Sequence, residues 1–300
     1  MKRNIAGILF FCLIILCSCG PRKAQNTTPS ESNTKKAYIE NKGSDTLVNL
    51  ALAWAEKYQN DHQDVQISVT GGGSGTGFTA LINGSIDIAN ASREIKPEEI
   101  EEARKNGFEP VEFIVANDAI AVIVNPNNPI SELTLEHVSR IYKGELNNWK
   151  ELGGEDRPIV RLSRETNSGT HVYFLETVIR LGSKEDKSIF SADTLLLPSS
   201  EGIIAEVSDN PNAIGYDGLG YVTKDVKMIA LAKTVGEPFV LPSAATVISN
   251  QYPVSRHLFM YTRGQPEGVE KDYIDWILSP EAQSIITELG FVPVDPVDKP

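Results

Sequence analysis

Thr70-Gly71-Gly72-Gly73-Ser74-Gly75-Thr76-Gly77 is a run of glycines and hydroxyl side chains that separates a predicted strand from a predicted helix. The alternating residues 65–69 favour the strand, and Phe78, Leu81 and Ile82 follow at helical spacing. Glycines let the backbone approach a ligand closely, and the first N–H groups of a helix have no partner within it. The positive end of the helix dipole lies behind them, so the run predicts an anion-binding loop. A flexible Gly/Ser linker is the alternative interpretation.

Three known glycine-rich motifs do not fit this run. A Walker loop ends in Gly-Lys-Ser/Thr, whereas Gly77 is followed by Phe78. The dinucleotide pattern G-x-G-x-x-G fits at no register, and the hydrolase pattern G-x-S-x-G fails because Thr76 occupies the last glycine position. The run therefore predicts a small anion site without nucleotide-binding or nucleophilic residues.

A second segment repeats the order of strand, hydroxyl-rich turn and helix. Residues 158–162 favour a strand, residues 163–170 form the turn, and a helical pattern follows. Arg164 can bind a tetrahedral oxyanion through two N–H groups, and Ser168-Gly169-Thr170 can donate to its other oxygens. Taken alone, Arg164 also fits a surface or ion-paired role. Two such segments in one chain favour an oxyanion site.

The N-terminal residues favour secretion and lipid attachment. A basic start precedes an apolar run over residues 5–16, which is typical of a signal peptide and too short for an ordinary membrane span. Leu16-Cys17-Ser18-Cys19 resembles a bacterial lipobox, so we expect a lipoprotein signal peptide at 1–18 and a lipid such as palmitate on Cys19. All three cysteines lie in this region, so cleavage would leave no disulfide. A cleaved signal without lipid is the alternative. Residues 19–36 lack large apolar side chains and predict a flexible tether.

The composition excludes several classes of function. The net charge is −12 and no basic stripe with interleaved aromatics is present, so we expect no nucleic-acid binding. An acidic protein must bind an anion with local donors, because its overall field opposes the anion. The four histidines lack metal-ligand spacing, and His171 alone lies near a predicted site, where packing or capping suits it better than catalysis. A phosphohydrolase would need a metal cluster or an activated nucleophile, so we expect neither enzyme activity nor a cofactor.

The remaining chain alternates predicted strands and helices. Two β-rich runs at 111–115 and 119–124 are broken by Asn117-Asp118, and Pro97 begins a helix. We also expect strands at 37–40, 86–93, 213–216, 246–248 and 258–261, and helices at 134–142, 200–207 and 273–289. This order predicts two α/β lobes with mostly parallel sheets and a ligand at the carboxyl ends of the strands.

A helical stripe from Leu47 to Tyr58 follows Ser44-Asp45-Thr46 directly. These three side chains supply N-cap chemistry for that helix. On local grounds, capping and a ligand role are equally consistent with the sequence.

Several segments together resemble the phosphate-binding proteins of bacterial phosphate ABC transporters. The segments are Gly43-Ser44-Asp45-Thr46, residues 71–77, residues 87–93, Asn147 with Trp149, Arg164 with Ser168-Gly169-Thr170, residues 213–216, and Tyr252-Pro253-Val254-Ser255-Arg256. The resemblance extends from about Ala37 to Val294. Each segment alone is weak, but their combination and order are specific to this family.

The resemblance implies a two-lobed α/β fold of the periplasmic-binding-protein type (type II), with the ligand cleft between the lobes. Lobe I would comprise residues 37–116 and 247–300, and lobe II residues 117–246. It also implies phosphate-binding residues on both lobes, and these are Ser44, Asp45, Thr46, Ser74, Arg93, Arg164, Ser168, Gly169 and Thr170.

One position departs from the family pattern. Well-known members have an aspartate after the Ala-Ser of the third segment, where it accepts the proton of hydrogen phosphate, but this chain has Arg93. We predict that Asp45 supplies the acceptor and that Arg93 pairs with Asp45 or with the ligand. The alternative makes Arg93 part of an interlobe ion pair and Asp45 only a helix cap. An aspartate that follows the site arginine in those members is also absent, so the residues that hold Arg164 stay open.

The function implied is that of an extracytoplasmic, lipid-anchored receptor, in the periplasm or on the cell surface. It would bind inorganic phosphate as a monomer and deliver it to a membrane ABC permease. The alternatives are a receptor for another tetrahedral oxyanion, such as sulfate or molybdate, and a secreted phosphohydrolase.

Overall fold

The computed structural model describes residues 36–294. The predicted signal peptide, Cys19 and nearly all of the tether lie outside the described residues, as does the end of lobe I after Val294. Among residues 36–294, no helix combines the length and the apolar character that crossing a membrane requires.

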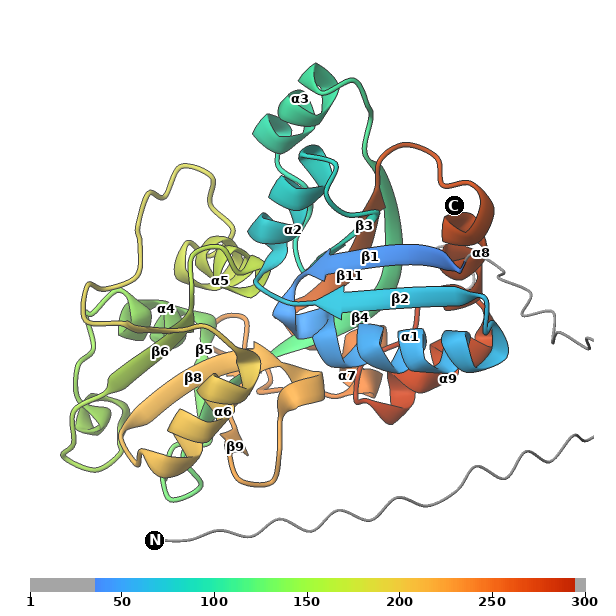
Figure 1. Cartoon of the computed structure of the whole chain (residues 1–300). Coiled ribbons are helices and arrows are strands. Elements are labelled where there is room, and N and C mark those ends of the chain that lie inside the picture. The colour runs from blue at the N-terminus through green and yellow to red at the C-terminus, as the bar shows by residue number, and fades with distance from the viewer. Residues whose placement is uncertain (1–35, 295–300) are drawn as a thin grey trace, which may run out of the picture. The chain divides into compact units, whose positions relative to one another are not determined.

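One mixed sheet organises the described part of the chain. Its strands run in the spatial order β2-β1-β3-β11-β4-β8-β6-β7, with β9 paired to β4 (Figure 1). The strands are β1 (Ala37–Gly43), β2 (Val65–Thr70), β3 (Ile88–Ala91), β4 (Val111–Val124), β6 (Val160–Arg164), β7 (Leu195–Leu197), β8 (Ala213–Gly218), β9 (Lys227–Met228) and β11 (Ser255–Thr262). A separate parallel pair is formed by β5 (Glu132–Thr134) and β10 (Ala230–Ala232).

Strand β4 corrects the prediction of two runs broken at Asn117-Asp118, because it continues without a break from Val111 to Val124. Residues 111–119 pair with β11, and residues 120–124 pair with β8. The two polar residues stay in the strand because both have partners: Asn117 bonds to the backbone of Val292, and Asp118 accepts from Arg256. We call β2, β1, β3, β11 and residues 111–119 the first half-sheet, and residues 120–124, β8, β6 and β7 the second half-sheet.

The sheet is parallel only toward its ends. Strands β2, β1 and β3 run parallel, as do β7, β6 and β8, whereas β3-β11-β4-β8 pair antiparallel. The expected mostly parallel sheets are thus joined by antiparallel strands. The loops after β1, β2, β3 and β6, which contain the predicted site residues, lie at the carboxyl ends of parallel strands, as the alternation of strands and helices predicted.

Helices cover both half-sheets. They are α1 (Val48–Asp61), α2 (Ser74–Ile82), α3 (Pro97–Lys105), α4 (Leu135–Tyr142), α5 (Gly169–Phe174), α6 (Ser200–Asp209), α7 (Ala244–Ile248), α8 (Gly268–Ile277) and α9 (Pro280–Glu288). Figure 1 shows α2 and α3 on one side of the first half-sheet and α1 with α9 on the other. The predicted stripe on α1 is confirmed, since Leu50, Trp54 and Tyr58 are buried and the Trp54 indole donates to the Ala282 carbonyl at 3.0 Å.

Residues 246–248 form the end of α7 and not the predicted strand. The β-branched residues favoured a strand. A capping box overrides this preference: the Ser243 hydroxyl accepts from the Thr246 amide at 3.1 Å, and the Thr246 hydroxyl accepts from the Ser243 amide at 2.9 Å.

Candidate functional site

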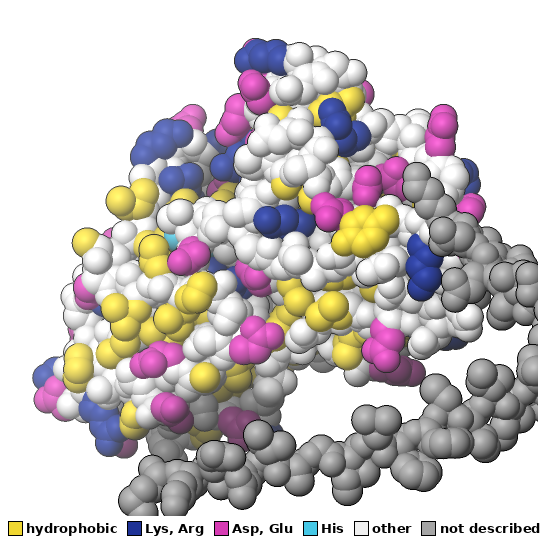
Figure 2. Space-filling model, in the orientation of Figure 1, with side chains coloured by type: hydrophobic (Ala, Val, Ile, Leu, Met, Phe, Trp, Pro, Cys, Tyr) yellow, Lys and Arg dark blue, Asp and Glu magenta, His cyan; other side chains and the backbone are white. Residues whose placement is uncertain are grey.

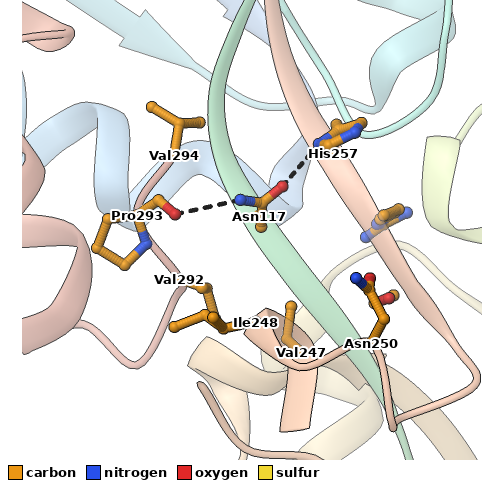
Figure 3. A pocket seen from close by; sticks show the side chains of 10 residues that line it. Asn117, Val247, Ile248, Asn250, His257, Val292, Pro293 and Val294 are labelled. Atoms are coloured by element: carbon orange, nitrogen blue, oxygen red, sulfur yellow. Dashed lines mark hydrogen bonds between the residues drawn. The ribbon is translucent and has the colours of Figure 1, made fainter. Parts of the chain in front are cut away.

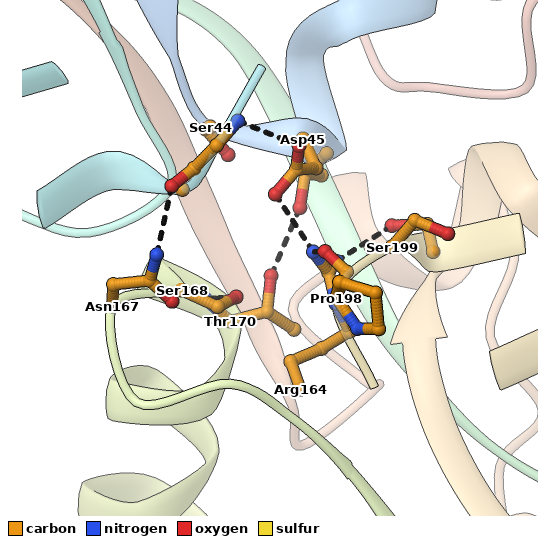
Figure 4. A network of polar contacts seen from close by, with 12 residues as sticks. Ser44, Asp45, Arg164, Asn167, Ser168, Thr170, Pro198 and Ser199 are labelled. Atoms are coloured by element: carbon orange, nitrogen blue, oxygen red, sulfur yellow. Dashed lines mark hydrogen bonds and ion pairs between the residues drawn. The ribbon is translucent and has the colours of Figure 1, made fainter. Parts of the chain in front are cut away.

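Loops from both half-sheets meet where β1, β2, β3 and β6 end (Figure 4). Ser44-Asp45-Thr46 follows β1, and residues 71–74 lead from β2 into α2. Ser92 and Arg93 follow β3, and Arg164 ends β6 just before α5. The carboxyl ends of the parallel strands therefore bring these segments together, as expected for an α/β ligand site.

Buried hydroxyl groups form the centre of this region. The Ser44 hydroxyl donates to Ser92 Oγ at 2.8 Å, and the Ser92 amide donates to Ser74 Oγ at 3.0 Å. Thr46 Oγ1 and Thr170 Oγ1 lie 2.9 Å apart, which joins the first half-sheet to α5. The structure thus brings together Ser44, Thr46, Ser74 and Thr170 of the predicted site.

Ser44, Asp45 and Thr46 do not cap α1 with their side chains. The short 3₁₀ turn Asp45–Leu47 precedes α1, and neither its start nor that of α1 has a side-chain cap bond. All three side chains contact other loops, so capping is the wrong alternative for this segment. The tertiary contacts are favoured because Ser92, Arg164 and Thr170 are buried polar groups that also require hydrogen bonds.

The glycine run is an ordered loop and not a linker. Gly72 and Gly73 have φ values of 114° and 88°, which suit glycine. A Cβ atom on Gly73 would lie 2.8 Å from the carbonyl oxygen of Asn167. Asn167 precedes α5 and bonds to this loop twice: its carbonyl accepts from the Gly75 amide at 3.0 Å, and its side chain donates to the Gly72 carbonyl at 2.9 Å. The glycines therefore allow close contact between the two loops.

Arg164 lies almost fully buried, with its guanidinium held on several sides. It donates to the Ser200 hydroxyl, the Pro198 carbonyl and Asp45 Oδ2, each at 2.8 Å. Asp217 Oδ2 lies 3.7 Å from the same guanidinium. Asp45 and Asp217 thus hold Arg164, so a surface role for Arg164 is wrong and an ion-paired role is confirmed.

Asp45 connects its own loop after β1 with the glycine loop after β2 and with Arg164 at the end of β6. Its Oδ1 accepts from the Gly72 amide at 2.9 Å, while its Oδ2 accepts from Arg164. A carboxylate has about four lone-pair positions, so these two bonds leave capacity for a further donor. Tyr221 donates to the Asp45 backbone carbonyl at 2.6 Å and fixes this residue from the second half-sheet side.

Ser168, Gly169 and Thr170 begin α5. The Ser168 hydroxyl caps the helix, because its oxygen accepts from the amides of Thr170 and His171 at 3.2 and 3.5 Å. The hydroxyl proton of Ser168 is then directed away from the helix. Gly169 packs so closely that an added Cβ would lie 2.4 Å from Ser74 Oγ and 2.6 Å from Ser92 Oγ.

Arg93 does not pair with Asp45, so this part of the prediction is wrong. Its guanidinium forms a two-bond ion pair with Glu99 of α3 at 2.7 and 2.8 Å and stacks over Phe78. Both partners belong to the first half-sheet side, so the interlobe ion pair is also wrong. The prediction failed because Glu99 lies one helical turn into α3 and reaches back to Arg93. A direct contact of Arg93 with the ligand stays a prediction.

Arg93→Gln and Glu99→Gln form a matched pair that tests this contact. We expect each variant to lower the free energy of unfolding by about 1–3 kcal/mol, because each leaves a partly buried charge without its partner. Urea titration measures this loss, and calorimetric titration measures the affinity for phosphate. Equal affinities would assign Arg93 to the ion pair, whereas a loss confined to Arg93→Gln would place it at the ligand.

Asp118 and Arg256 are not among the nine predicted site residues, yet they contact this region. The Arg256 guanidinium donates to Asp118 Oδ2 at 3.1 Å and to Thr170 Oγ1 at 3.0 Å. Burial raises the pKa of Asp118 to about 6, although the adjacent Arg256 acts in the opposite direction. The Tyr252–Arg256 segment of the family resemblance was the available signal for Arg256.

His171 packs against Ser163 and Phe190 on the side of the second half-sheet. Its Nδ1 lies 3.0 Å from both Ser163 Oγ and the Arg164 carbonyl, and its ring stacks on Phe190. Burial lowers the pKa of this histidine. These contacts agree with the packing role expected for it.

A separate pocket of about 730 Å³ lies beside the point where β4 changes partner (Figure 3). Asn117 and His257 contact each other on its wall, and residues 292–294 line its other side. Arg256 also lines it, but none of the nine predicted site residues is among the described residues of its lining. The hydroxyl cluster, and not this pocket, is therefore the candidate site.

Comparison with known proteins identifies the family of the chain. Residues 28–281 match the PBP superfamily domain. The chain is 33% identical to the phosphate-binding protein PstS of Pseudomonas aeruginosa over 84% of this chain and 81% of that protein. It is 30% identical to PstS of Bacillus subtilis over 98% of this chain and 95% of that protein.

Solved structures similar to this chain also come from phosphate transport proteins. A Clostridium perfringens structure, described as a phosphate ABC transporter substrate-binding protein with bound phosphate, superposes with a TM-score of 0.75 at 32% identity, covering 86% of this chain and all of that chain. An ABC-type phosphate transport receptor from Vibrio cholerae has a TM-score of 0.68 at 29% identity, with the same coverage. The chain therefore belongs to the PstS-like family of the periplasmic-binding-protein superfamily.

Proposed function

We propose that this protein binds inorganic phosphate between the two half-sheets and delivers it to a membrane ABC permease. The observation that carries the proposal is that the loops of the two half-sheets contact each other through the hydroxyls of Thr46 and Thr170 and through Asp45 and the buried Arg164. Hydrogen bonds between ionised groups and such donors are shorter and stronger than neutral ones, and a dry site strengthens them further. The PstS relatives are named as phosphate-binding proteins, which supports the same ligand.

Seven of the nine predicted residues would pair with the anion, donate to it or approach it closely. Arg164 would pair with the anion, and the hydroxyls of Ser44, Thr46, Ser74, Ser168 and Thr170 would donate to its oxygens. The backbone of Gly169 would approach the anion closely because it has no side chain. Donors on both half-sheets favour a closed arrangement, so binding would bring the halves together by a hinge motion.

The proposed lobes are residues 37–116 with 247–300 and residues 117–246. The half-sheets support a division of this kind, although residues 117–119 pair with β11 of the first half-sheet. The proposed lipid on Cys19 and the tether over residues 19–36 would keep this receptor near its permease. On the face drawn in Figure 2, acidic and basic side chains are interspersed, which suits local capture of an anion better than attraction by the overall charge.

Calorimetric titration of the purified protein with phosphate and then with sulfate tests this function. We expect one-to-one phosphate binding and no response to sulfate. Equal binding of both anions would indicate a general oxyanion receptor, and silence toward both would reject the proposal. Phosphatase turnover that Ser168→Ala abolishes would support a phosphohydrolase instead.

Asp45→Asn tests the source of selectivity. Sulfate has no proton to donate at neutral pH, so a carboxylate acceptor discriminates against it. We expect the variant to bind sulfate measurably and to lose at least about 10-fold of its preference for phosphate. Asp217→Asn is the control, because Asp217 also faces Arg164 but has no proposed contact with the ligand. An unchanged preference in Asp45→Asn would refute the acceptor role.

A further inference from the structure

We propose that Arg256 is a positioning residue that directs the hydroxyl protons of Thr46 and Thr170 toward the bound anion. This inference rests on the phosphate site proposed above and adds a residue that acts through two of its donors. Arg256 would set the direction of the hydroxyl bonds, whereas Arg164 would supply the charge that attracts the anion.

The contacts of Arg256 span three parts of the site. It lies on β11 and its side chain is buried. One terminal nitrogen donates to the Ser92 carbonyl at 2.8 Å. The other lies 3.0 Å from Thr170 Oγ1, 3.1 Å from Asp118 Oδ2 and 3.3 Å from Thr46 Oγ1. This one guanidinium therefore reaches a threonine on each side of the site.

The direction of these bonds follows from the chemistry of the groups. Arginine can only donate, so both threonine oxygens act as acceptors toward it. A hydroxyl has one proton and rotates to suit its partners. The 2.9 Å contact between Thr46 and Thr170 uses one of their two protons. An anion that replaces this contact offers acceptors to both protons, while Arg256 occupies an acceptor position on each oxygen.

Asp118 fixes Arg256 and offsets its charge. This carboxylate is fully buried on β4, and its other oxygen accepts from the Leu219 amide at 3.1 Å. Gly218 allows the close approach, because a Cβ there would lie 2.8 Å from Asp118 Oδ2. The charge of Arg256 is thus paired with that of Asp118. In this proposal Arg256 affects the anion through its hydrogen bonds to Thr46 and Thr170.

A double-mutant cycle between Arg256 and Thr170 tests the inference, with phosphate affinity measured by calorimetry. We expect Arg256→Gln to weaken binding about 10-fold in the wild-type background but at most about 3-fold in the Thr170→Val background. Equal fold losses in both backgrounds would overturn the proposal, because a role through charge or fold does not depend on the Thr170 hydroxyl. If wild-type protein shows no phosphate binding, the proposed function itself fails.

Arg256→Lys keeps the inference testable if Arg256→Gln does not fold. Lysine retains the charge but cannot reproduce the planar set of donors. We expect it to lose affinity and to show the same dependence on Thr170. Full affinity in Arg256→Lys would assign Arg256 a role through charge and reject positioning. Arg161→Lys is the matched control, because Arg161 is also buried and paired with an aspartate, Asp193, away from the site.

Discussion

Arg164→Lys is expected to weaken phosphate binding by about 100-fold, since removing one side of a buried charged contact costs several kcal/mol. The guanidinium of Arg164 divides its donors among Ser200, Pro198 and Asp45, which fixes its plane. A lysine ammonium is a point charge that cannot satisfy these partners and an anion at the same time. Asp45 and the fully buried Asp217 would also compete with phosphate for it.

Calorimetric titration of Arg164→Lys and Arg161→Lys separates binding from folding. Arg161 donates to Asp193 at 2.9 Å and to the Leu146 carbonyl at 2.7 Å, and it contacts none of the predicted site residues among the described contacts. Both variants should lose stability in urea, but only Arg164→Lys should lose phosphate affinity. Equal affinities would mean that the anion does not contact Arg164.

Gly169→Ala is expected to lower phosphate affinity by at least about 10-fold, because a side chain at this position does not fit between the loops of the two half-sheets. The added methyl group would lie 2.4 Å from Ser74 Oγ and 2.6 Å from Ser92 Oγ, which is closer than atoms can pack. The loops on the two half-sheets would therefore stay apart. The proposed donors on the two sides would then reach an anion only with longer bonds.

Gly202→Ala provides the control for this substitution. Gly202 lies in the first turn of α6, and the nearest atom to an added Cβ is Ser199 Oγ at 3.3 Å. This variant should keep wild-type affinity. If Gly169→Ala binds phosphate as tightly as Gly202→Ala, the closed arrangement of the two loops is not needed for binding.

The sequence predicted best which residues lie close together where a local rule applied. Ser74 and Thr170 lie in the first turns of α2 and α5, each of which follows a strand and a short loop, and the carboxyl ends of parallel strands bring such segments together. Predictions that depended on a partner far along the chain were incomplete. Arg164 is held by Asp45, which lies 119 positions earlier, and no local pattern joins the two residues.

The errors in the fold have the same origin. Asn117-Asp118 suggested a break in β4, but Arg256 supplies a partner for Asp118 inside the sheet. The β-branched residues 246–248 suggested a strand, whereas Ser243 caps a short helix there. Tertiary contacts override local preference in the first case, and cap chemistry overrides it in the second.

The position of β11 between β3 and β4 determines which half-sheet can assemble first during synthesis. The first half-sheet contains strands from the beginning of the chain, yet β11, which pairs with both β3 and β4, ends only at Thr262. Residues 120–218 already include the four strand segments of the second half-sheet. During synthesis the second half-sheet is therefore fully available first. The amino-terminal strands must wait for the last third of the polypeptide before their sheet can close.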